Sequence, residues 1–91
     1  MKNVFIIIYE LSNPSSNYDR LGNLIRSQNA WARLGSSVYI IETTETAIQV
    51  RDKLIKVLNM GDKLYVGKVG APAAWTGISE EVSMWLKNKL H

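Results

Sequence analysis

Residues 3 to 11 read NVFIIIYEL, and this stretch decides the fold. Apolar side chains occupy both alternating faces of it, which are Val4, Ile6 and Ile8 on one and Phe5, Ile7 and Tyr9 on the other. A strand that is apolar on both faces belongs in the interior of a sheet, with at least one face covered. We therefore expect residues 3 to 11 to form the central strand.

The segments that follow predict a helix and a pair of strands. Turn-forming residues 12 to 17, SNPSSN, end the first strand, and Ser16 with Asp19 resembles a capping box at the start of a helix. The apolar face of that helix consists of Leu21, Leu24 and Ile25. Residues 30 to 34, AWARL, and 37 to 43, SVYIIET, predict two antiparallel strands. A hairpin turn at Gly35 and Ser36, with Gly35 at positive φ, would join them.

The second half of the chain predicts a helix, a strand and another helix. Thr44 is a plausible N-cap for a helix with its apolar stripe at Ala47, Val50, Leu54, Val57 and Leu58, ended by Gly61 in the left-handed conformation. Residues 62 to 69 predict a fourth strand, which the run GAPAA at 70 to 74 cannot continue because proline lacks the N–H donor. Ser79 is expected to cap a final helix with an apolar face of Val82, Trp85, Leu86 and Leu90.

The order βαββαβ predicts a ferredoxin-like α+β sandwich in which both helices cover one face of the sheet. We expect a single domain over residues 1 to 91, with a core at 3 to 69 and a C-terminal extension at 70 to 91. The opposite face of the sheet is then solvated, covered by residues 71 to 91, or used for binding.

Composition narrows the class of protein. The 91 residues are 46% hydrophobic and 21% charged, which is typical of one ordered domain, and so small a domain makes partner contacts such as a homodimer attractive. No cysteine is present, so the reducing cytoplasm is the expected location. The apolar N-terminal run is too short to span a bilayer, and we expect no membrane association. A net charge of +3 permits nucleic-acid binding without requiring it.

Glu10 is the candidate catalytic and metal-binding residue. It stands at the end of the apolar first strand, beside a polar loop, where α/β sheets present ligands and metal ions. The alternative is a solvated acid at a strand terminus. A single carboxylate per chain makes a poor site for Mg²⁺ or Mn²⁺, but a dimer supplies two.

Basic and aromatic residues are the candidates for a binding surface. Arg20, Arg26, Arg33 and Lys68 are the candidate phosphate contacts. Trp31, Tyr39 and Tyr65 can stack on bases, and they suit a core or a dimer contact equally well. Trp31, Trp75 and Trp85 are the candidate interface residues, and the terminal His91 is given no catalytic role.

The stretches VFIIIYEL, YDRLGNLIRSQ, SVYIIET, VRDKLIKVL and DKLYVGKV, within residues 3 to 69, together resemble a known group of proteins. They are similar to the small CRISPR-associated adaptation nucleases, the second numbered family of those proteins, and to the virulence-associated protein D toxins. The chain looks closer still to small phage and bacterial proteins known as the SinR family.

The resemblance implies a homodimer that cleaves phosphodiesters with a metal ion bound by an acid after the tyrosine of the first strand. Glu10 follows Tyr9 here, which keeps the charge and changes the reach by one methylene. The arginine-rich start of the family's first helix is reduced to Arg20, and the C-terminal helix differs from the strand that commonly swaps between protomers.

Two hypotheses follow for the function. The first is a homodimeric, non-catalytic module of phage or mobile-element origin that binds nucleic acid or a host protein. The alternative is a metal-dependent endonuclease or ribonuclease with one Glu10 per protomer at a shared groove. Arg20 and Arg26 would position the nucleic-acid backbone.

Overall fold

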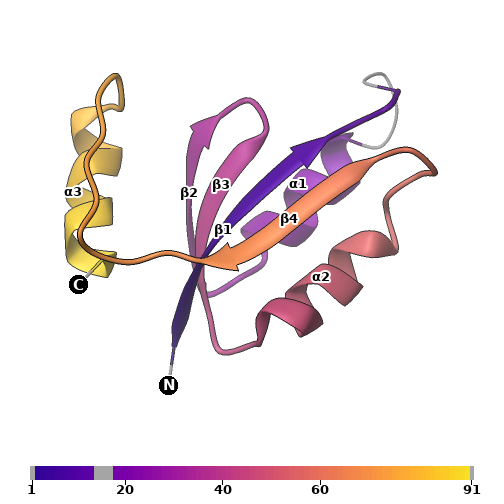
Figure 1. The fold of residues 1–91 in the computed structure, drawn as a ribbon, viewed down its shortest axis with the longest axis horizontal. Coiled ribbons are helices and arrows are strands. Elements are labelled where there is room, and N and C mark those ends of the chain that lie inside the picture. The colour runs from indigo at the N-terminus through magenta and orange to yellow at the C-terminus, as the bar shows by residue number, and fades with distance from the viewer. Residues whose placement is uncertain (1, 14–17, 91) are drawn as a thin grey trace.

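The computed structural model describes residues 2–13 and 18–90, and its ribbon is drawn in Figure 1. Along the chain lie β1 (Asn3–Glu10), α1 (Tyr18–Arg26), β2 (Ala30–Gly35), β3 (Val38–Thr43), α2 (Ala47–Ile55), β4 (Lys63–Lys68) and α3 (Glu80–Lys89). Ser16, predicted to cap the first helix, and His91, which was given no catalytic role, lie outside the described residues. The predicted α+β class is confirmed.

The four strands form one antiparallel sheet in the order β2-β3-β1-β4. The strand of residues 3–10 is central, as its two apolar faces predicted, and it pairs with β3 on one side and β4 on the other. Ile7 lies opposite Tyr39 and Val66, which places these three side chains on the same face of the sheet.

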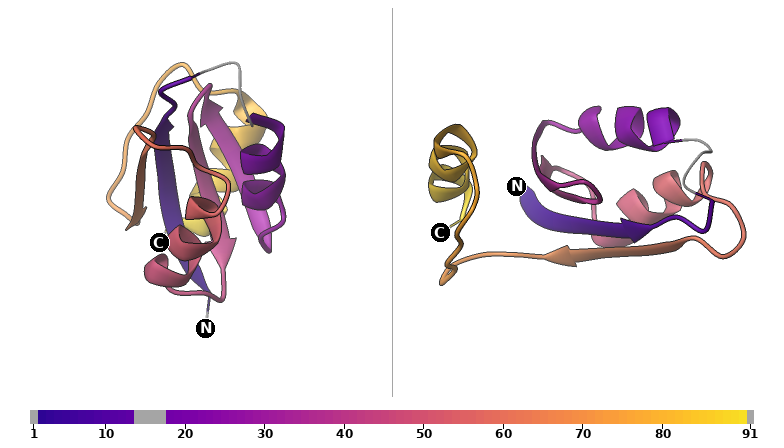
Figure 2. Two further views of the ribbon diagram at one scale, coloured as in Figure 1. Left: turned by 90° about the vertical axis from the view of Figure 1, so that its right-hand side faces the viewer. Right: turned by 90° about the horizontal axis from the view of Figure 1, so that it is seen from above.

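Helices α1 and α2 both cover that face (Figure 2). The core between them and the sheet is made of Phe5, Ile7, Tyr9, Leu21, Ile25, Tyr39, Ile41, Val50, Leu54 and Val57. The apolar stripe predicted for α1 is confirmed, and so is the part of the second stripe that lies on α2, at Ala47, Val50 and Leu54. The predicted end of this helix at Gly61 is wrong, because α2 ends at Ile55, and Val57 and Leu58 pack against the core from the segment after it. Ile48 and Ile55 on the flanks of α2 are 61% and 50% exposed.

The hairpin between β2 and β3 has its turn one residue later than predicted. Gly35 is still part of β2, where it pairs with Val38, and Ser36 and Ser37 form the turn. Gly35 does not take positive φ, unlike Gly61 at 89° and Gly77 at 79°. The pairing register shifts between Arg33 and Gly35. Arg33 pairs with Tyr39, but the next pair joins Val38 to Gly35 and not to Leu34, so the strand continues one residue further before the turn.

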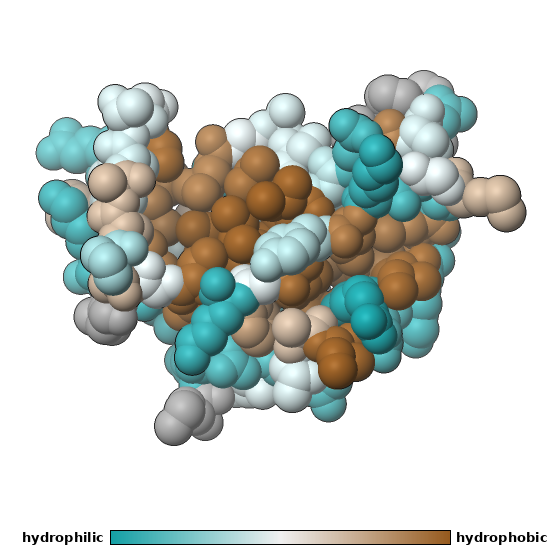
Figure 3. Space-filling model, viewed as in Figure 1, coloured by the Kyte–Doolittle hydropathy of each residue, from teal (hydrophilic) through white to brown (hydrophobic). Residues whose placement is uncertain are grey.

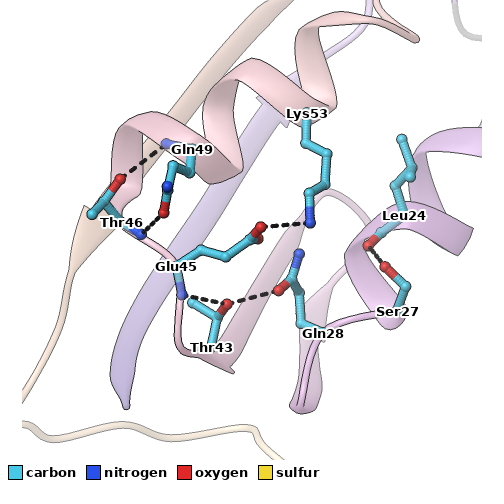
Figure 4. A network of polar contacts seen from close by, with 8 residues as sticks. All are labelled: Leu24, Ser27, Gln28, Thr43, Glu45, Thr46, Gln49 and Lys53. Atoms are coloured by element: carbon cyan, nitrogen blue, oxygen red, sulfur yellow. Dashed lines mark hydrogen bonds and ion pairs between the residues drawn. The ribbon is translucent and has the colours of Figure 1, made fainter. Parts of the chain in front are cut away.

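The N-cap of helix α2 lies two residues after the predicted one, because Thr46 and not Thr44 caps the helix. The Thr46 hydroxyl accepts from the Gln49 N–H at 3.1 Å, and the Gln49 side chain accepts from the Thr46 N–H at 2.9 Å (Figure 4). This is a capping box, and it satisfies two backbone donors at once.

A polar network closes the core beside this cap (Figure 4). Thr43 is 1% exposed, and its hydroxyl donates to Gln28 at 2.8 Å and accepts from the Glu45 N–H at 3.1 Å. Lys53 pairs with Glu45 at 2.7 Å. The network joins the end of β3 to the segment after α1 and to α2.

The C-terminal segment lies apart from the two-helix layer. After β4 the chain runs as a long irregular connection to α3, which contacts β2 at the opposite edge of the sheet (Figures 1 and 2). Ser79 caps α3 as predicted, accepting from the Val82 N–H at 3.2 Å. Within the described residues, no helix combines the length and apolar character needed to cross a membrane.

Candidate nucleic-acid interface

Glu10 is the last residue of β1, on the face of the sheet that α1 and α2 leave open. Its side chain is 75% exposed, and its Oε1 lies 3.3 Å from the Lys63 Nζ of the neighbouring strand. Glu10 and Lys63 are directly opposite each other in the pairing of β1 with β4. The carboxylate is therefore an exposed strand-end acid in a surface ion pair.

The surroundings of Glu10 do not suit a divalent cation within one chain. Among residues 2–13 and 18–90 there is no group of three or more His, Cys, Asp or Glu side chains placed to hold a metal ion. The Lys63 ammonium also competes for the carboxylate oxygen that a cation would need. One exposed carboxylate and one ammonium do not fit a site for Mg²⁺ or Mn²⁺.

A second acid near this end of the sheet has a structural role. Asp62 Oδ1 accepts from the Ser12 N–H at 2.7 Å and lies 2.9 Å from the Ser12 hydroxyl, and Oδ2 accepts from the Asn59 N–H at 2.7 Å. Hydrogen bonds from the Asn59 and Ser12 backbone, which favour the ionised form, lower the pKa of Asp62 below its usual value. This carboxylate ties the loop after β1 to the loop before β4.

The structure brings four of the candidate binding residues together at the edge of the sheet formed by β2, namely Arg26, Trp31, Arg33 and Tyr39. Arg26, at the end of α1, donates to the Tyr39 hydroxyl at 3.1 Å and to the Asn23 side chain at 3.0 Å. Its guanidinium carbon lies 5.8 Å from the centre of the Trp31 ring. Arg26 is thereby held between its own helix and the strands.

Arg33 approaches the same aromatic pair from β2. Its guanidinium donates to the backbone oxygens of Gly35 and Ser36, both at 3.0 Å, and lies 5.7 Å from the centre of the Tyr39 ring. The Trp31 and Tyr39 rings are 6.1 Å apart at an interplanar angle of 59°. We call the residues Arg26, Trp31, Tyr39 and Arg33 the arginine–aromatic row.

Among the described residues, the two guanidiniums in the row form no ion pair. The acceptors of their hydrogen bonds there are neutral: the Asn23 amide, the Tyr39 hydroxyl and two backbone carbonyls. The carboxylates that form ion pairs in the described part of the chain do so with lysines or with Arg51. A guanidinium has more N–H donors than the two that each arginine uses here, so donors remain for an anion.

Trp31 and Tyr39 have different parts in the row. Trp31 is 42% exposed, whereas Tyr39 is 1% exposed and belongs to the core. Trp31 is therefore the ring that a ligand can reach, and Tyr39 is a buried support for both arginines. Of the two roles considered for Tyr39, base stacking and a core contact, the structure supports the core contact.

The two other predicted phosphate contacts lie outside the row. Lys68 ends β4, the edge strand farthest from β2 in the sheet order. Arg20 is exposed on α1, where it borders a shallow hollow with Asn23, Leu24 and Val57. Among the described residues it makes no hydrogen bond or ion pair. The four basic residues therefore do not form one surface.

The candidate interface tryptophans are also divided. Trp75 donates its indole N–H to the Ser83 hydroxyl at 3.0 Å, and the Lys89 ammonium lies 5.9 Å from the centre of the Trp85 ring. Both contacts stay within the C-terminal segment. With Leu34, Ile40 and Leu86, Trp75 lines a hollow of about 390 Å³ between this segment and the sheet.

The open face of the sheet is apolar in its middle. In the view of Figure 3, hydrophobic residues gather over the strands and hydrophilic residues surround them. Ile8, Val38 and Tyr65 lie opposite one another in the pairing of three adjacent strands, and Ile8 and Tyr65 are 43% and 61% exposed. The C-terminal segment covers only the part of this face where Leu86, 1% exposed, is buried.

Two residues of the site were not anticipated, namely Gly22 and Asn23. The sequence does carry a signal for them, since Gly22 precedes Arg26 by four positions and Asn23 precedes it by three. Residues at these spacings are neighbours on a helix surface. What the spacing does not reveal is that the Arg26 side chain folds back over them.

Comparisons with known proteins give a likeness in fold. The sequence matches no protein-family model and no curated protein. A crystal structure of a hypothetical protein, TT1823, from Thermus thermophilus superposes with a TM-score of 0.69 at 21% sequence identity. The match covers 86% of this chain and 94% of that one, and at this identity it shows the fold alone.

Proposed function

We propose that this chain is a small ferredoxin-like module that binds nucleic acid through the arginine–aromatic row and does not cleave it. The observation that carries the proposal is the pair of guanidiniums, Arg26 and Arg33, fixed by neutral acceptors on either side of an aromatic pair. The strand order and the position of both helices on one face support the ferredoxin-like assignment.

Nucleic acid is the anion that suits this arrangement. Its phosphates take charge-assisted hydrogen bonds from arginine, and its bases stack on exposed aromatic rings. The row offers both groups side by side, with Trp31 as the accessible ring. The net charge of +3 adds a favourable long-range attraction.

Binding without cleavage is favoured because Glu10 lacks partners for catalysis. Its carboxylate faces Lys63, and the described part of the chain contains no group of three or more His, Cys, Asp or Glu side chains placed to hold a metal ion. The nearby Asp62 is engaged by Ser12 and Asn59. The alternative, a metal-dependent nuclease, requires two protomers to bring their Glu10 side chains together. The arginine–aromatic row, which does not include Glu10, contains no carboxylate or imidazole that could act as a general base.

A cleavage assay separates these two functions. End-labelled single-stranded RNA and duplex DNA are incubated with the protein and with its Glu10→Gln variant, in Mg²⁺, in Mn²⁺ and in chelator. We expect shifted but intact nucleic acid in every lane and no effect of the substitution. Metal-dependent products that disappear in Glu10→Gln would establish the nuclease instead.

A second candidate function is self-association through the open face of the sheet. The apolar strip at Ile8 and Tyr65 favours it, since contiguous exposed apolar surface on a small domain marks an interaction site. The Glu10 and Lys63 pair beside the strip offers charges of both signs, which the same pair of a twofold-related copy can complement. A homodimer would carry two arginine–aromatic rows.

A further inference from the structure

A glycine on α1 makes room for the arginine that leads the row. Gly22 and Arg26 are one helical turn apart. A Cβ atom on Gly22 would lie 2.9 Å from Arg26 Nη1, 3.1 Å from Nη2 and 3.3 Å from the guanidinium carbon. A Cβ atom essentially never lies within 3.0 Å of a non-bonded heavy atom, so the guanidinium occupies space that any other residue at position 22 would need.

Three other side chains complete the enclosure. Tyr39 accepts from Nη1 at 3.1 Å, Asn23 accepts from Nη2 at 3.0 Å, and the Trp31 ring faces the guanidinium at 5.8 Å. Gly22, Asn23, Trp31 and Tyr39 together form what we call the guanidinium seat. Two of its members come from α1 and two from the sheet, so it exists only in the folded protein.

We infer that Gly22 is a positioning residue for nucleic-acid binding, because it holds the Arg26 guanidinium in the seat before any ligand arrives. The inference rests on the proposed function of the row. Gly22 itself touches no ligand and acts through Arg26.

Preorganisation is the physical reason that the seat matters. A flexible arginine loses rotamer freedom when it binds a phosphate, and this loss weakens binding. Arg26 has already lost that freedom on folding, while Arg20 on the same helix makes no hydrogen bond or ion pair with the described residues that would restrict it. The helix also gives up intrinsic stability at this point, because glycine is a poorer helix former than alanine.

The substitution Gly22→Ala changes the position of the Arg26 guanidinium without changing the charge of the protein. The net charge is unchanged, and the group that must move is the far end of a flexible side chain, so the fold tolerates the methyl group. We expect the melting temperature to stay the same or to rise. We expect the affinity for a labelled oligonucleotide to fall about two- to tenfold, which is the usual cost of ordering one long side chain.

A double-mutant cycle with Arg26→Gln shows whether the loss passes through Arg26. Gly22→Ala should weaken binding of a 20-nucleotide labelled RNA by the wild type and have no further effect on Arg26→Gln. Gly70→Ala, an exposed glycine after the opposite edge strand, is the matched control and should bind like the wild type. An equal loss in both backgrounds, or none in either, would overturn the inference while leaving the proposed function intact.

A measurement without nucleic acid tests the seat itself. NMR of the arginine side chains should show slow rotation about the Cζ–N bonds of Arg26 in the wild type and faster rotation in Gly22→Ala. Arg20 serves as the mobile reference within the same molecule. Fast rotation of Arg26 in the wild type would contradict the seat. A slow rotation combined with no binding of any nucleic acid would refute both the proposed function and the role of Gly22 in it.

Discussion

Arginines in this chain differ in what surrounds them, and that difference matters more than their number. Arg51 pairs with Asp52 at 2.9 Å on the exposed side of α2, so its charge is already compensated. Arg26 and Arg33 instead have neutral acceptors and aromatic neighbours. A positive charge with neutral partners remains available to an external anion, whereas a paired one must first be released.

At the same scale, Asp62 gives a prediction about pH. Its pKa is lowered from the usual 3.8, so its contribution to the free energy of unfolding is present above that pH. The contribution is lost as the pH falls through the lower pKa of the folded state. We expect Asp62→Asn to unfold at a lower urea concentration at pH 7, and the difference from the wild type to shrink toward pH 3.

The control for this prediction is Asp52→Asn, which alters an exposed pair between neighbouring residues. It should change the urea midpoint little, because such surface pairs contribute little to stability. A difference between Asp62→Asn and the wild type that stays constant from pH 7 to pH 3 would rule out ionisation of Asp62 as its source.

The existence of the helices and strands was the most predictable property of the molecule. The residues at which they begin and end were the least predictable. Alternating or helical spacing of apolar residues sufficed for β1, α1 and α2, because burial in one core imposes that spacing. The N-cap of α2 was misplaced although the sequence carries a capping box, with Gln49 three residues after Thr46. Thr44 is also a good capping residue, and only the pairing with Gln49 distinguishes the two positions.

The site was less predictable than the fold because it joins separate elements. Period-two alternation alone puts Trp31 and Arg33 on the same face of β2. The approach of Arg26 depends on how α1 packs on the sheet, and local sequence does not report that packing. Lys68 was grouped with the arginines by charge, although the strand order places it at the opposite edge.

Helix α3 gives a prediction about a single element. Leu86, 1% exposed, and the Lys89 contact with Glu42 at 3.2 Å fasten it to the rest of the fold. We expect Leu86→Ala to release α3 while the sheet stays folded, since removing a buried leucine costs about 2–5 kcal/mol. Hydrogen exchange should show lost protection for amides of α3 and retained protection for those of β1.

Met84→Ala is the matched control for Leu86→Ala, because Met84 lies on the same helix and is 60% exposed. Its exchange pattern should equal that of the wild type. If Leu86→Ala lowered protection in β1 as much as in α3, the helix and the sheet would belong to one cooperative unit, contrary to this account.

At the scale of the whole molecule, the sheet separates two kinds of surface. One face packs on α1 and α2, with the arginine–aromatic row at its β2 edge. The other face is open and apolar in its middle (Figure 3). A second copy on the open face would leave the row of each chain accessible, so self-association and nucleic-acid binding are compatible.

Introducing a charge at one residue of the open face tests self-association. Tyr65→Glu places a carboxylate in the apolar strip, where Tyr65 is 61% exposed. We expect light scattering with size-exclusion chromatography to show a wild-type dimer and a Tyr65→Glu monomer with an unchanged circular dichroism spectrum. The control is Met60→Glu. Met60 lies in the loop before β4 and is 98% exposed, so this variant should remain dimeric. A wild type that is monomeric at about 100 μM would contradict the dimer.

The central claim is that the arginine–aromatic row binds nucleic acid, and a titration of two protein variants tests it most directly. Labelled 20-nucleotide RNA is titrated with the wild type, with Arg26→Gln/Arg33→Gln and with the matched control Arg51→Gln/Lys56→Gln, at several salt concentrations. The two variant proteins have the same net charge. We predict that the first binds roughly 100-fold more weakly, from charge-assisted hydrogen bonds worth about 1.5 kcal/mol each, and that the control loses far less. Equal losses for both variants would mean that only overall charge matters, and that the row is not the binding site.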